Sequence, residues 1–515
     1  MATLYIAAIT AWDSVGAAEV TLYFSSGTGY ISASGDTPAN TWYEPRIIQP
    51  AFMRRDAFTN RRTSGRSSVS FGELVLANPD GELDYMADYE FDGRAIVLQV
   101  GTLTKPGTPT WATVLVGKIE QATFGWNNVT IRLRDRQLEF DKTFQATKYA
   151  GTNAGSSGIE GLPDDLKGRP KPRAYGFAFN VPAPCVNSTV WVYQVNDGPV
   201  AQVAALYDQG VAFTSRTVAT DLTDLYATTL AAGTYRDCPS LGLFRIGANP
   251  AGLITADVLV YVSDANEQRV GQIIYDIVTG PGGVAPADIN DDDFTDLDAD
   301  AYTYVGLWSG AEETTVAAQL DILTNSIGAY WGFDTLGKFR VRQLKAPTGT
   351  AVLTLTQTEI LSIDRAASRD ESRGIPSWRV NLGYKPVGIT QETVAGAATA
   401  VRKAFVSRQF RRVTVETASI KTKHPLAVEL TRDTAMQLEG NASSEATRLL
   451  ALHGVRRDIF EVSAILPPAD MALLDINSVV AVDIDRYGMS GGRSFRVIGL
   501  MPDLRRNRID LTLWG

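Results

Sequence analysis

The fold is decided by four short runs near the end of the chain: IFEVSAI at residues 459–465, SVVAVDI at 478–484, FRVIGL at 495–500 and RIDLTLW at 508–514. Apolar and polar residues alternate along these runs, and a period of two is typical of strands with one buried face. Polar turns separate them. We therefore expect the last quarter of the chain to form a small antiparallel β-barrel or sandwich.

Upstream, three groups of apolar residues have the spacing of one helix face. They are Val270, Ile273, Ile274 and Ile277, ended by Gly280-Pro281; Val316, Leu320, Leu323 and Ile327, ended by Gly328; and Ala446, Leu449, Leu450 and His453, ended by Gly454. A capping-box spacing at Ser309-Gly310-Ala311-Glu312 predicts that the second helix opens there.

Hairpin patterns occur in the first and the middle third of the chain. The run VTIRLRD at 129–135 follows the turn Gly125-Trp126-Asn127-Asn128, so we expect it to pair with VLVGKI at 114–119. Similarly, YWGF at 330–333 and FRVRQL at 339–344 flank a polar turn that ends in Gly337. Both hairpins are expected to be antiparallel.

Together the patterns predict a mainly β protein with a few helices, that is, a β-rich α+β chain of several domains. The 515 residues allow three or four domains. We place a β-rich domain at 1–150, a linker or long loop at 151–174, a β-rich insertion at 175–262, an α+β domain at 263–350, and a domain with a helix and the β-barrel at 351–515.

The composition excludes several classes of protein. Only two cysteines are present, Cys185 and Cys238, so we expect reduced structural thiols instead of a disulfide scaffold or a four-cysteine zinc module. The net charge of −9 does not favour a phosphate backbone. No export signal and no apolar run long enough for a membrane span is evident. We expect a soluble chain made in a reducing cytosol.

One acidic stretch, at residues 290–300, suggests a metal site. Asp296, Asp298 and Asp300 have the spacing of the first three ligands of an EF-hand. The sixth position is Ala301 instead of Gly and the twelfth is Leu307 instead of Glu, so the EF-hand pattern fails. Two interpretations stay open, a solvated acidic loop and a looser carboxylate site for a divalent cation, and we assign no metal ligands.

No catalytic motif is present. His424 and His453 lie 29 residues apart without other metal-ligand spacing, and His453 occupies the last turn of its helix, where a cation favours the helix dipole. Serine-hydrolase elbows and glycine-rich nucleotide loops are absent. A carboxylate pair for glycoside hydrolysis stays open, because such pairs are seldom close in sequence. We expect no enzymatic activity and no cofactor.

Arginines gather in two places. Arg54, Arg55, Arg61, Arg62 and Arg66 lie within thirteen residues, and Arg408, Arg411 and Arg412 form a second group. A nucleic-acid patch is one interpretation. A solvated loop or a salt-bridged contact with an acidic partner chain is favoured on this acidic chain, and we expect no sequence-specific nucleic acid.

The last quarter resembles the hub and baseplate proteins at the tip of bacteriophage tails. The resemblance is carried by LDINSVV at 474–480, RYGM at 486–489, GRSFRVIG at 492–499 and NRIDLTLWG at 507–515. In those proteins the first run usually has Gly-Asp where this chain has Asn477-Ser478. Two further segments are similar to such proteins, FGELVLANPDGELDY at 71–85 and GAYWGFD with GKFRV at 328–341.

The resemblance implies a structural protein of a virion, located at the tail tip of a long, non-contractile-tailed phage or a tail-derived particle and assembled in the host cytoplasm. Hub proteins of this kind are usually homotrimers whose β-barrel domains form a pseudo-sixfold ring. The ring joins the tail tube and the distal tail ring to the central tip or fibre and lines the DNA exit channel. Expected partners are copies of the chain itself, the distal tail protein, the tape measure and the tip or fibre proteins, with no membrane insertion of its own.

Two alternatives remain beside the hub. One is a distal tail ring or receptor-binding tail protein, and a ring predicts hexamers where the hub predicts trimers. A tail-associated enzyme that degrades carbohydrate or peptidoglycan would depend on a few carboxylates, with the acidic stretch as the first place to look.

Overall fold

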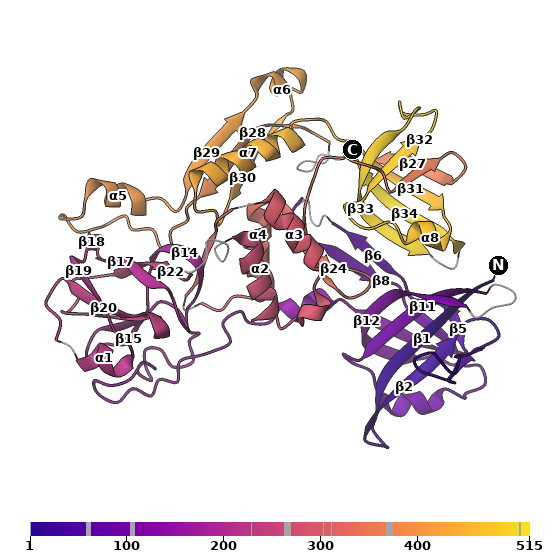
Figure 1. The fold of residues 1–515 in the computed structure, drawn as a ribbon, viewed down its shortest axis with the longest axis horizontal. Coiled ribbons are helices and arrows are strands. Elements are labelled where there is room, and N and C mark those ends of the chain that lie inside the picture. The colour runs from indigo at the N-terminus through magenta and orange to yellow at the C-terminus, as the bar shows by residue number, and fades with distance from the viewer. Residues whose placement is uncertain are drawn as a thin grey trace.

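The structure is a computed structural model that describes residues 2–57, 63–103, 109–227, 229–261, 269–301, 303–310, 312–366, 374–503 and 506–515. Within these ranges the strands form six sheets, and three helices lie in the middle of the molecule (Figure 1). The expected class, a mainly β multidomain protein with a few helices, is confirmed. No sheet in the described ranges closes into a barrel.

The N-terminal domain is one large sheet. Its strands are β1 (Ala2–Asp13), β2 (Ala18–Ser25), β3 (Tyr30–Ile31), β4 (Trp42–Pro45), β5 (Ile47–Gln49), β9 (Leu74–Ala77), β10 (Tyr89–Glu90), β11 (Ala95–Leu103), β12 (Thr110–Phe124) and β13 (Asn128–Arg134). They run in the order β3-β4-β2-β1-β11-β12-β13-β9-β5, with β10 beside β1. The predicted hairpin across Trp126 is confirmed, with Phe124 opposite Val129.

A segment of the N-terminal third leaves this sheet and joins other domains. It contains β6 (Met53–Asp56), β7 (Gly65–Arg66) and β8 (Ser68–Phe71). Strand β6 pairs with β33 (Arg493–Asp503) near the other end of the chain, and Arg55 lies opposite Leu500. Strand β7 pairs in parallel with β24 (Ala329–Phe333). The N-terminal domain is therefore tied to both the middle and the C-terminal part.

The insertion domain consists of two five-stranded sheets. One contains β14 (Arg173–Val181), β17 (Gln202–Asp208), β18 (Val211–Ala212), β22 (Ile254–Leu259) and β23 (Gly306–Ser309); the other contains β15 (Cys185–Asn187), β16 (Val192–Gln194), β19 (Ser215–Val218), β20 (Thr234–Cys238) and β21 (Leu243–Ile246). Stacked rings of Tyr193 and Phe244, 5.2 Å apart, belong to the shared core. Helix α1 (Leu222–Ala227) packs on β20. Residues 151–172 are irregular, and Leu166 is buried against this domain.

The centre of the molecule is a helical layer on a hairpin. Helices α2 (Val270–Thr279), α3 (Asp291–Asp300) and α4 (Val316–Ser326) share a core with β24 and β25 (Phe339–Gln343), in which Trp331 is fully buried. The hairpin β24–β25 and helix α2 are confirmed as predicted. Short 3₁₀ turns lie at Asp84–Asp88, Arg136–Phe140, Pro239–Leu241 and Pro286–Asp288.

Two expectations about this region are wrong. Residues 291–300 form helix α3 instead of an acidic loop, because Asn290 caps its start and carboxylates in a first turn favour the helix dipole. The second helix begins at Val316, not at Ser309. Its cap is Thr315, whose hydroxyl accepts a hydrogen bond from the Ala318 amide at 3.2 Å, while Ser309 ends strand β23.

A smaller sheet follows, with one long helix against it. It contains β28 (Ser377–Tyr384), β29 (Arg411–Glu416) and β30 (Val428–Asp433), and the helices are α5 (Ala400–Val406), α6 (Ala418–Lys423) and α7 (Glu439–His453). Helix α7 packs on β28 and β29 and buries the predicted apolar face, including Leu449. None of the described helices is long and apolar enough to cross a membrane.

The C-terminal domain contains all four runs that opened the sequence analysis. They form β31 (Ile459–Ile465), β32 (Val479–Asp483), β33 and β34 (Arg508–Trp514), as predicted. With β26 (Leu353–Thr356) and β27 (Ile360–Ala366) they give the order β26-β32-β33-β34-β31-β27. Strand β26 pairs with β32 in parallel, so the result is an open mixed sheet instead of a closed antiparallel barrel. Helix α8 (Pro468–Met471) precedes β32.

Candidate functional site: a charge network between domains

Three separate parts of the chain meet at the turn between α8 and β32. The Asp475 carboxylate accepts hydrogen bonds from Arg55 Nη1 at 2.5 Å and from Arg342 Nη1 at 3.0 Å. Arg55 lies on β6 and Arg342 on β25. The Asp475 carboxylate of the C-terminal domain therefore binds both strand β6 from the N-terminal third and the central hairpin. The interdomain charge network, as we name it, consists of Arg55, Asp293, Asp334, Arg340, Arg342 and Asp475.

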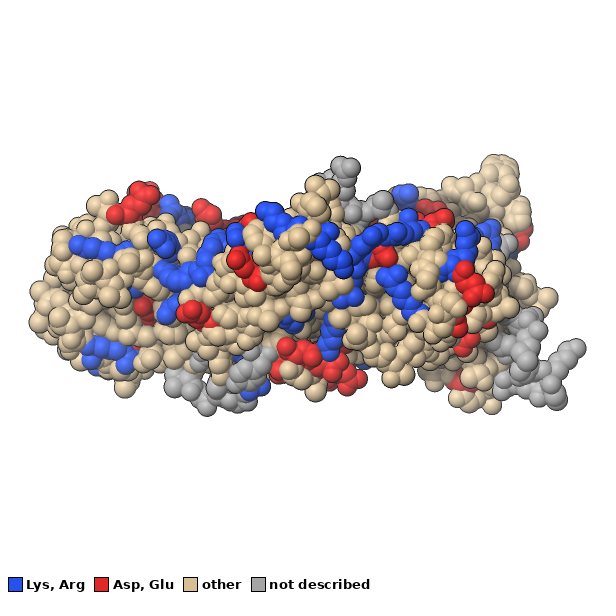
Figure 2. All heavy atoms as spheres, turned by 90° about the horizontal axis from the view of Figure 1, so that it is seen from above, with Lys and Arg blue, Asp and Glu red and all other residues tan. Residues whose placement is uncertain are grey.

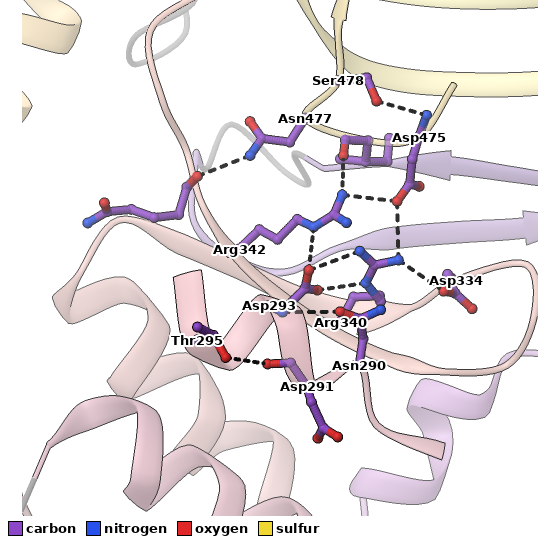
Figure 3. Close-up of polar contacts among 12 residues, drawn as sticks. Asn290, Asp291, Asp293, Thr295, Asp334, Arg340, Arg342, Asp475, Asn477 and Ser478 are labelled. Carbon is purple, nitrogen blue, oxygen red and sulfur yellow. Dashed lines mark hydrogen bonds and ion pairs between the residues drawn. The ribbon is translucent and has the colours of Figure 1, made fainter. Parts of the chain in front are cut away.

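The turn itself depends on Asn477. This residue has a φ of +74°, a conformation that Gly and Asn adopt more easily than other residues. Its side chain donates a hydrogen bond to the Gln343 carbonyl at 3.3 Å (Figure 3). Asn477 therefore occupies a backbone position that favours Gly or Asn, and its side chain adds a contact to the central hairpin.

Asp293 is the second acidic centre of the network. It extends from α3 and accepts from Arg340 Nε at 2.6 Å and from Arg342 Nε at 2.8 Å (Figure 3). Arg340 Nη1 also donates to Asp334 Oδ2 at 3.1 Å. The two arginines lie two residues apart on β25, so they project from the same face of the hairpin. Three arginines and three aspartates therefore balance in charge.

Burial and pairing shift the pKa values of these carboxyls in opposite directions. Burial raises the pKa of Asp293 to about 6 despite Arg342, because its side chain is only 3% exposed. Burial likewise raises the pKa of Asp334. Burial also raises the pKa of Asp475, but Arg55 and Arg342 outweigh it, and the net pKa is lowered. Asp475 therefore stays ionised where Asp293 begins to accept a proton.

The arrangement joins three parts of the chain through paired charges. Each carboxylate of the network is engaged by an arginine, so none is placed as an unpaired base or nucleophile. Within the described ranges, no three His, Cys, Asp or Glu side chains are placed to share a metal ion. Removing one partner of a buried ion pair costs about 3–5 kcal/mol, whereas the intact pair contributes little net stability. The intact network is therefore expected to add little net stability, whereas the loss of one partner is expected to be costly.

The candidate cation ligands do not converge. Asp296, Asp298 and Asp300 follow one another along α3, and Asp300 forms an ion pair with Lys345. Ala301 follows the helix as its C-cap, and Leu307 lies on β23. The acidic residue of α3 that belongs to the interdomain charge network is Asp293, which is not among the residues with EF-hand spacing.

The two histidines lie in different surroundings. His453 is buried at the end of α7 beside Trp514, and burial, with Arg432, Arg448 and Arg457 nearby, lowers its pKa well below the usual value. It is therefore neutral and does not supply the cation that would favour the helix dipole there. His424 lines a surface pocket at the end of α6.

Most of the described arginines of the two clusters contact groups of this chain. Arg55 contacts Asp475, Arg54 pairs with Asp56 at 3.0 Å, and Arg66 pairs with Asp141 at 2.9 Å. Arg61 and Arg62 lie outside the described residues. In the second group, Arg412 pairs with Asp433 at 2.6 Å and Arg411 lies over the Phe405 ring, while Arg408 is exposed. The acidic partners in these pairs belong to the same chain, and a salt-bridged contact with a partner chain stays a prediction.

Both cysteines are free thiols. Cys238 is buried and Cys185 is partly buried, and burial raises the pKa of the Cys185 thiol. This agrees with two reduced structural cysteines.

Sequence reasoning missed the network because its members are far apart in the chain. Arg55 and Asp475 are separated by 420 positions. One signal was present: Arg340 and Arg342 lie on either side of Val341 at alternate positions of a predicted strand, which places two cations on one face. The segment that supplies Asp475 resembles tail hub proteins in sequence, but its charge pattern does not indicate an ion pair.

The fold and this site define a mainly β protein of several domains that are joined by buried ion pairs. No family model matches the chain, and no curated protein sequence matches it. Among solved structures, the chain is similar to a tail protein from Neisseria meningitidis MC58, at 10% identity and a TM-score of 0.37, covering 99% of this chain and 96% of that one.

It is also similar to a 43 kDa tail protein of prophage MuSo2 from Shewanella oneidensis, at 11% identity and a TM-score of 0.35, covering 92% and 96% of the two chains. A chain in the virion of a native gene transfer agent particle matches at 14% identity and a TM-score of 0.42, covering 71% and 88%. The structural neighbours are thus phage tail proteins and a virion chain, the class to which the sequence resemblance points. At these TM-scores the likeness assigns no role.

Proposed function

We propose that this chain is a structural protein of a phage tail or tail-derived particle, and that it acts as the hub at the tail tip. In this role it joins the tail tube and the distal tail ring to the central tip or fibre and surrounds the exit channel of the DNA. It acts as a homotrimer, in contact with the other tail proteins, and catalyses no reaction.

One observation carries the proposal. Two of the three segments that resemble tail hub proteins, residues 328–341 and the final quarter, supply Asp334, Arg340 and Asp475 to the interdomain charge network. Three of the six residues of the network therefore lie in segments that carry the resemblance, and their partners Arg55, Asp293 and Arg342 lie outside them. A fixed arrangement is what a joint between tube and tip requires, because both neighbours bind one chain at defined positions.

The absence of a catalytic step is part of the proposal. Asp293, whose pKa burial raises to about 6, is engaged by two arginines, in contrast to the unpaired acid or base that hydrolysis requires. Purified protein that hydrolyses cell-wall or glycan substrates, and loses that activity when one carboxylate is replaced, would contradict this part.

Immunogold electron microscopy of particles from the source, with antibody raised against this chain, tests the location. We expect gold at the tail tip of intact particles. Tailed particles that never label, with the protein found only free in the cell, would overturn the proposal.

A further inference from the structure

The second arginine group belongs to a basic surface around α5. Residues 385–412 include six Lys and Arg and a single carboxylate, that of Glu392. Arg402 and Arg412 each have an aspartate partner within the chain. The other four cations form a surface that we name the α5 basic cluster, and they are Lys385, Lys403, Arg408 and Arg411.

None of these four cations has a carboxylate partner among the described residues. The Arg411 guanidinium donates to the carbonyls of Lys385 and Phe405, and it lies 3.9 Å from the centre of the Phe405 ring. The Lys385 ammonium lies 5.6 Å from the centre of the same ring. Burial lowers the pKa of Arg411, and the nearby cations Arg402 and Arg408 lower it further. The cluster therefore holds positive charges close together without an anion that balances them.

The α5 basic cluster is accessible from solvent. Arg408 is exposed, and the other three cations are partly exposed. Val401 on α5 is 81% exposed and adds an apolar side chain to this surface. Figure 2 looks down on the face that carries α5 and α6 and shows Lys and Arg in a band along it. A complementary partner presents exposed carboxylates with an apolar side chain among them.

One segment of the same chain has this complementary chemistry. Residues 82–92 contain five exposed carboxylates and neither Lys nor Arg, and none of the five forms an ion pair with a described residue. Leu83, Met86 and Phe91 are buried in the N-terminal core and hold the segment in place. Tyr85 is 45% exposed. We name the segment the acidic turn, and its five acidic residues are Glu82, Asp84, Asp88, Glu90 and Asp92.

The two surfaces lie far apart within one copy of the chain. Helix α5 lies at one end of the long axis of the molecule, and the N-terminal domain lies toward the other end (Figure 1). Arg94, the first cation after the acidic turn, pairs with Glu19 at 2.5 Å and leaves the turn without a counter-charge. A contact between the two surfaces therefore joins different copies.

We propose that the acidic turn of one copy of this chain binds the α5 basic cluster of a second copy. The proposal rests on the homotrimer of the proposed function and names a contact within it. Opposite charges on the two surfaces steer association and fix its orientation, while Tyr85 and Val401 supply an apolar contact. Because the two surfaces differ, the contact is head-to-tail, and it closes into a ring when the rotation between copies allows.

Charge reversal, followed by sedimentation velocity of the full chain over a range of concentrations, tests the contact. Lys403→Glu combined with Arg408→Glu places two carboxylates against the acidic turn and is expected to raise the dissociation constant at least about tenfold. Asp88→Lys combined with Glu90→Lys is expected to do the same from the other surface. All four changes in one chain reverse both surfaces, so association should return to within about threefold of the unmodified chain.

Lys421→Glu combined with Lys423→Glu is the matched control. Both lysines are exposed on α6, which follows the end of β29 that is remote from Arg411, so their reversal should leave association unchanged. Salt gives a second readout. Association of the unmodified chain should weaken as NaCl is raised from about 0.05 to 0.5 M, because salt screens exposed charges.

Either double reversal that associates like the unmodified chain would overturn the contact, and so would a combined variant that stays as weak as the double reversals. A control that weakens association as much as the α5 variant would show that the whole basic face attracts other copies, and it would overturn this contact too. An unmodified chain that stays monomeric would also overturn it. If the chain is found at tail tips while the double reversals associate normally, the proposed function stands and only the contact fails.

Discussion

Replacing Asp475 by Asn should weaken the attachment of β6 to the C-terminal sheet. The amide keeps the size of the side chain but removes the charge that holds Arg55 at 2.5 Å and Arg342 at 3.0 Å. Breaking a fully buried pair costs about 3–5 kcal/mol. The Asp475 side chain is 27% exposed, so solvent screens part of this loss, and about 2 kcal/mol is expected at the contact.

Hydrogen exchange of the native protein, followed by mass spectrometry, measures this loss locally. A loss of about 2 kcal/mol in the free energy of local opening corresponds to roughly 30-fold faster exchange of the β6 amides. A global unfolding midpoint is a poorer measure, because a chain of several domains need not unfold in one step.

Asp433→Asn provides the matched control. Asp433 pairs with Arg412 at 2.6 Å, but both side chains are nearly half exposed, and exposed pairs contribute about 0–1 kcal/mol. Exchange in β30 should therefore change by less than about fivefold. If Asp475→Asn changes the exchange of β6 no more than this control changes β30, the charge network does not hold β6 in place.

Three further changes test the site and its surroundings. The pKa of Asp293 is raised to about 6, so the folded state keeps the proton of this carboxyl to a higher pH than the unfolded chain does. Relative to Asp293→Asn, the unmodified protein should therefore lose up to about 3 kcal/mol of stability in urea titrations as pH rises from about 4 to 6. A difference between the two proteins that stays constant with pH would refute this. The pKa of His453 is lowered, so its contribution to stability is present above about pH 6.5 and is lost as pH falls. His453→Gln should therefore flatten the acid side of a plot of thermal stability against pH. An unchanged plot would contradict the conclusion that the His453 imidazole is buried and neutral. Asn477 has a positive φ, so Asn477→Gly should lower the free energy of unfolding by less than about 1 kcal/mol and Asn477→Val by about 1–3 kcal/mol. Urea titration measures both losses. Equal losses would show that backbone strain does not determine which residue this position accepts.

Local patterns in the sequence were sufficient for most individual elements. The alternation in residues 459–514 predicted four strands, and the apolar spacing around Ile273 and Leu449 predicted two helices, because each pattern depends on neighbours a few residues away. The start of α4 was misplaced because Ser309 and Thr315 are both good caps, and only tertiary pairing of Ser309 in β23 decides between them. Likewise, the acidic composition of α3 suggested a loop until Asn290 and the burial of Asp293 are taken into account.

The candidate site could not be predicted in the same way. Arg55 reaches Asp475 only because β6 leaves its own domain and pairs with β33. The alternation of apolar and polar residues in a strand shows which face is buried, but it does not show with which distant strand the strand pairs. The charges of Arg340 and Arg342 gave a partial signal, two cations on one strand face, without naming the acidic partner. The resemblance pointed to the segment with Asp475, and the structure supplies the physical role of that aspartate.

Cryo-electron microscopy of tails from the source particle tests the central claim most directly. The account predicts three copies of this chain in a ring at the tail tip, between the distal tail ring and the central tip or fibre. Six copies in a ring would assign the chain to the distal tail ring instead. A tail tip whose density contains no copy of this chain would contradict the account.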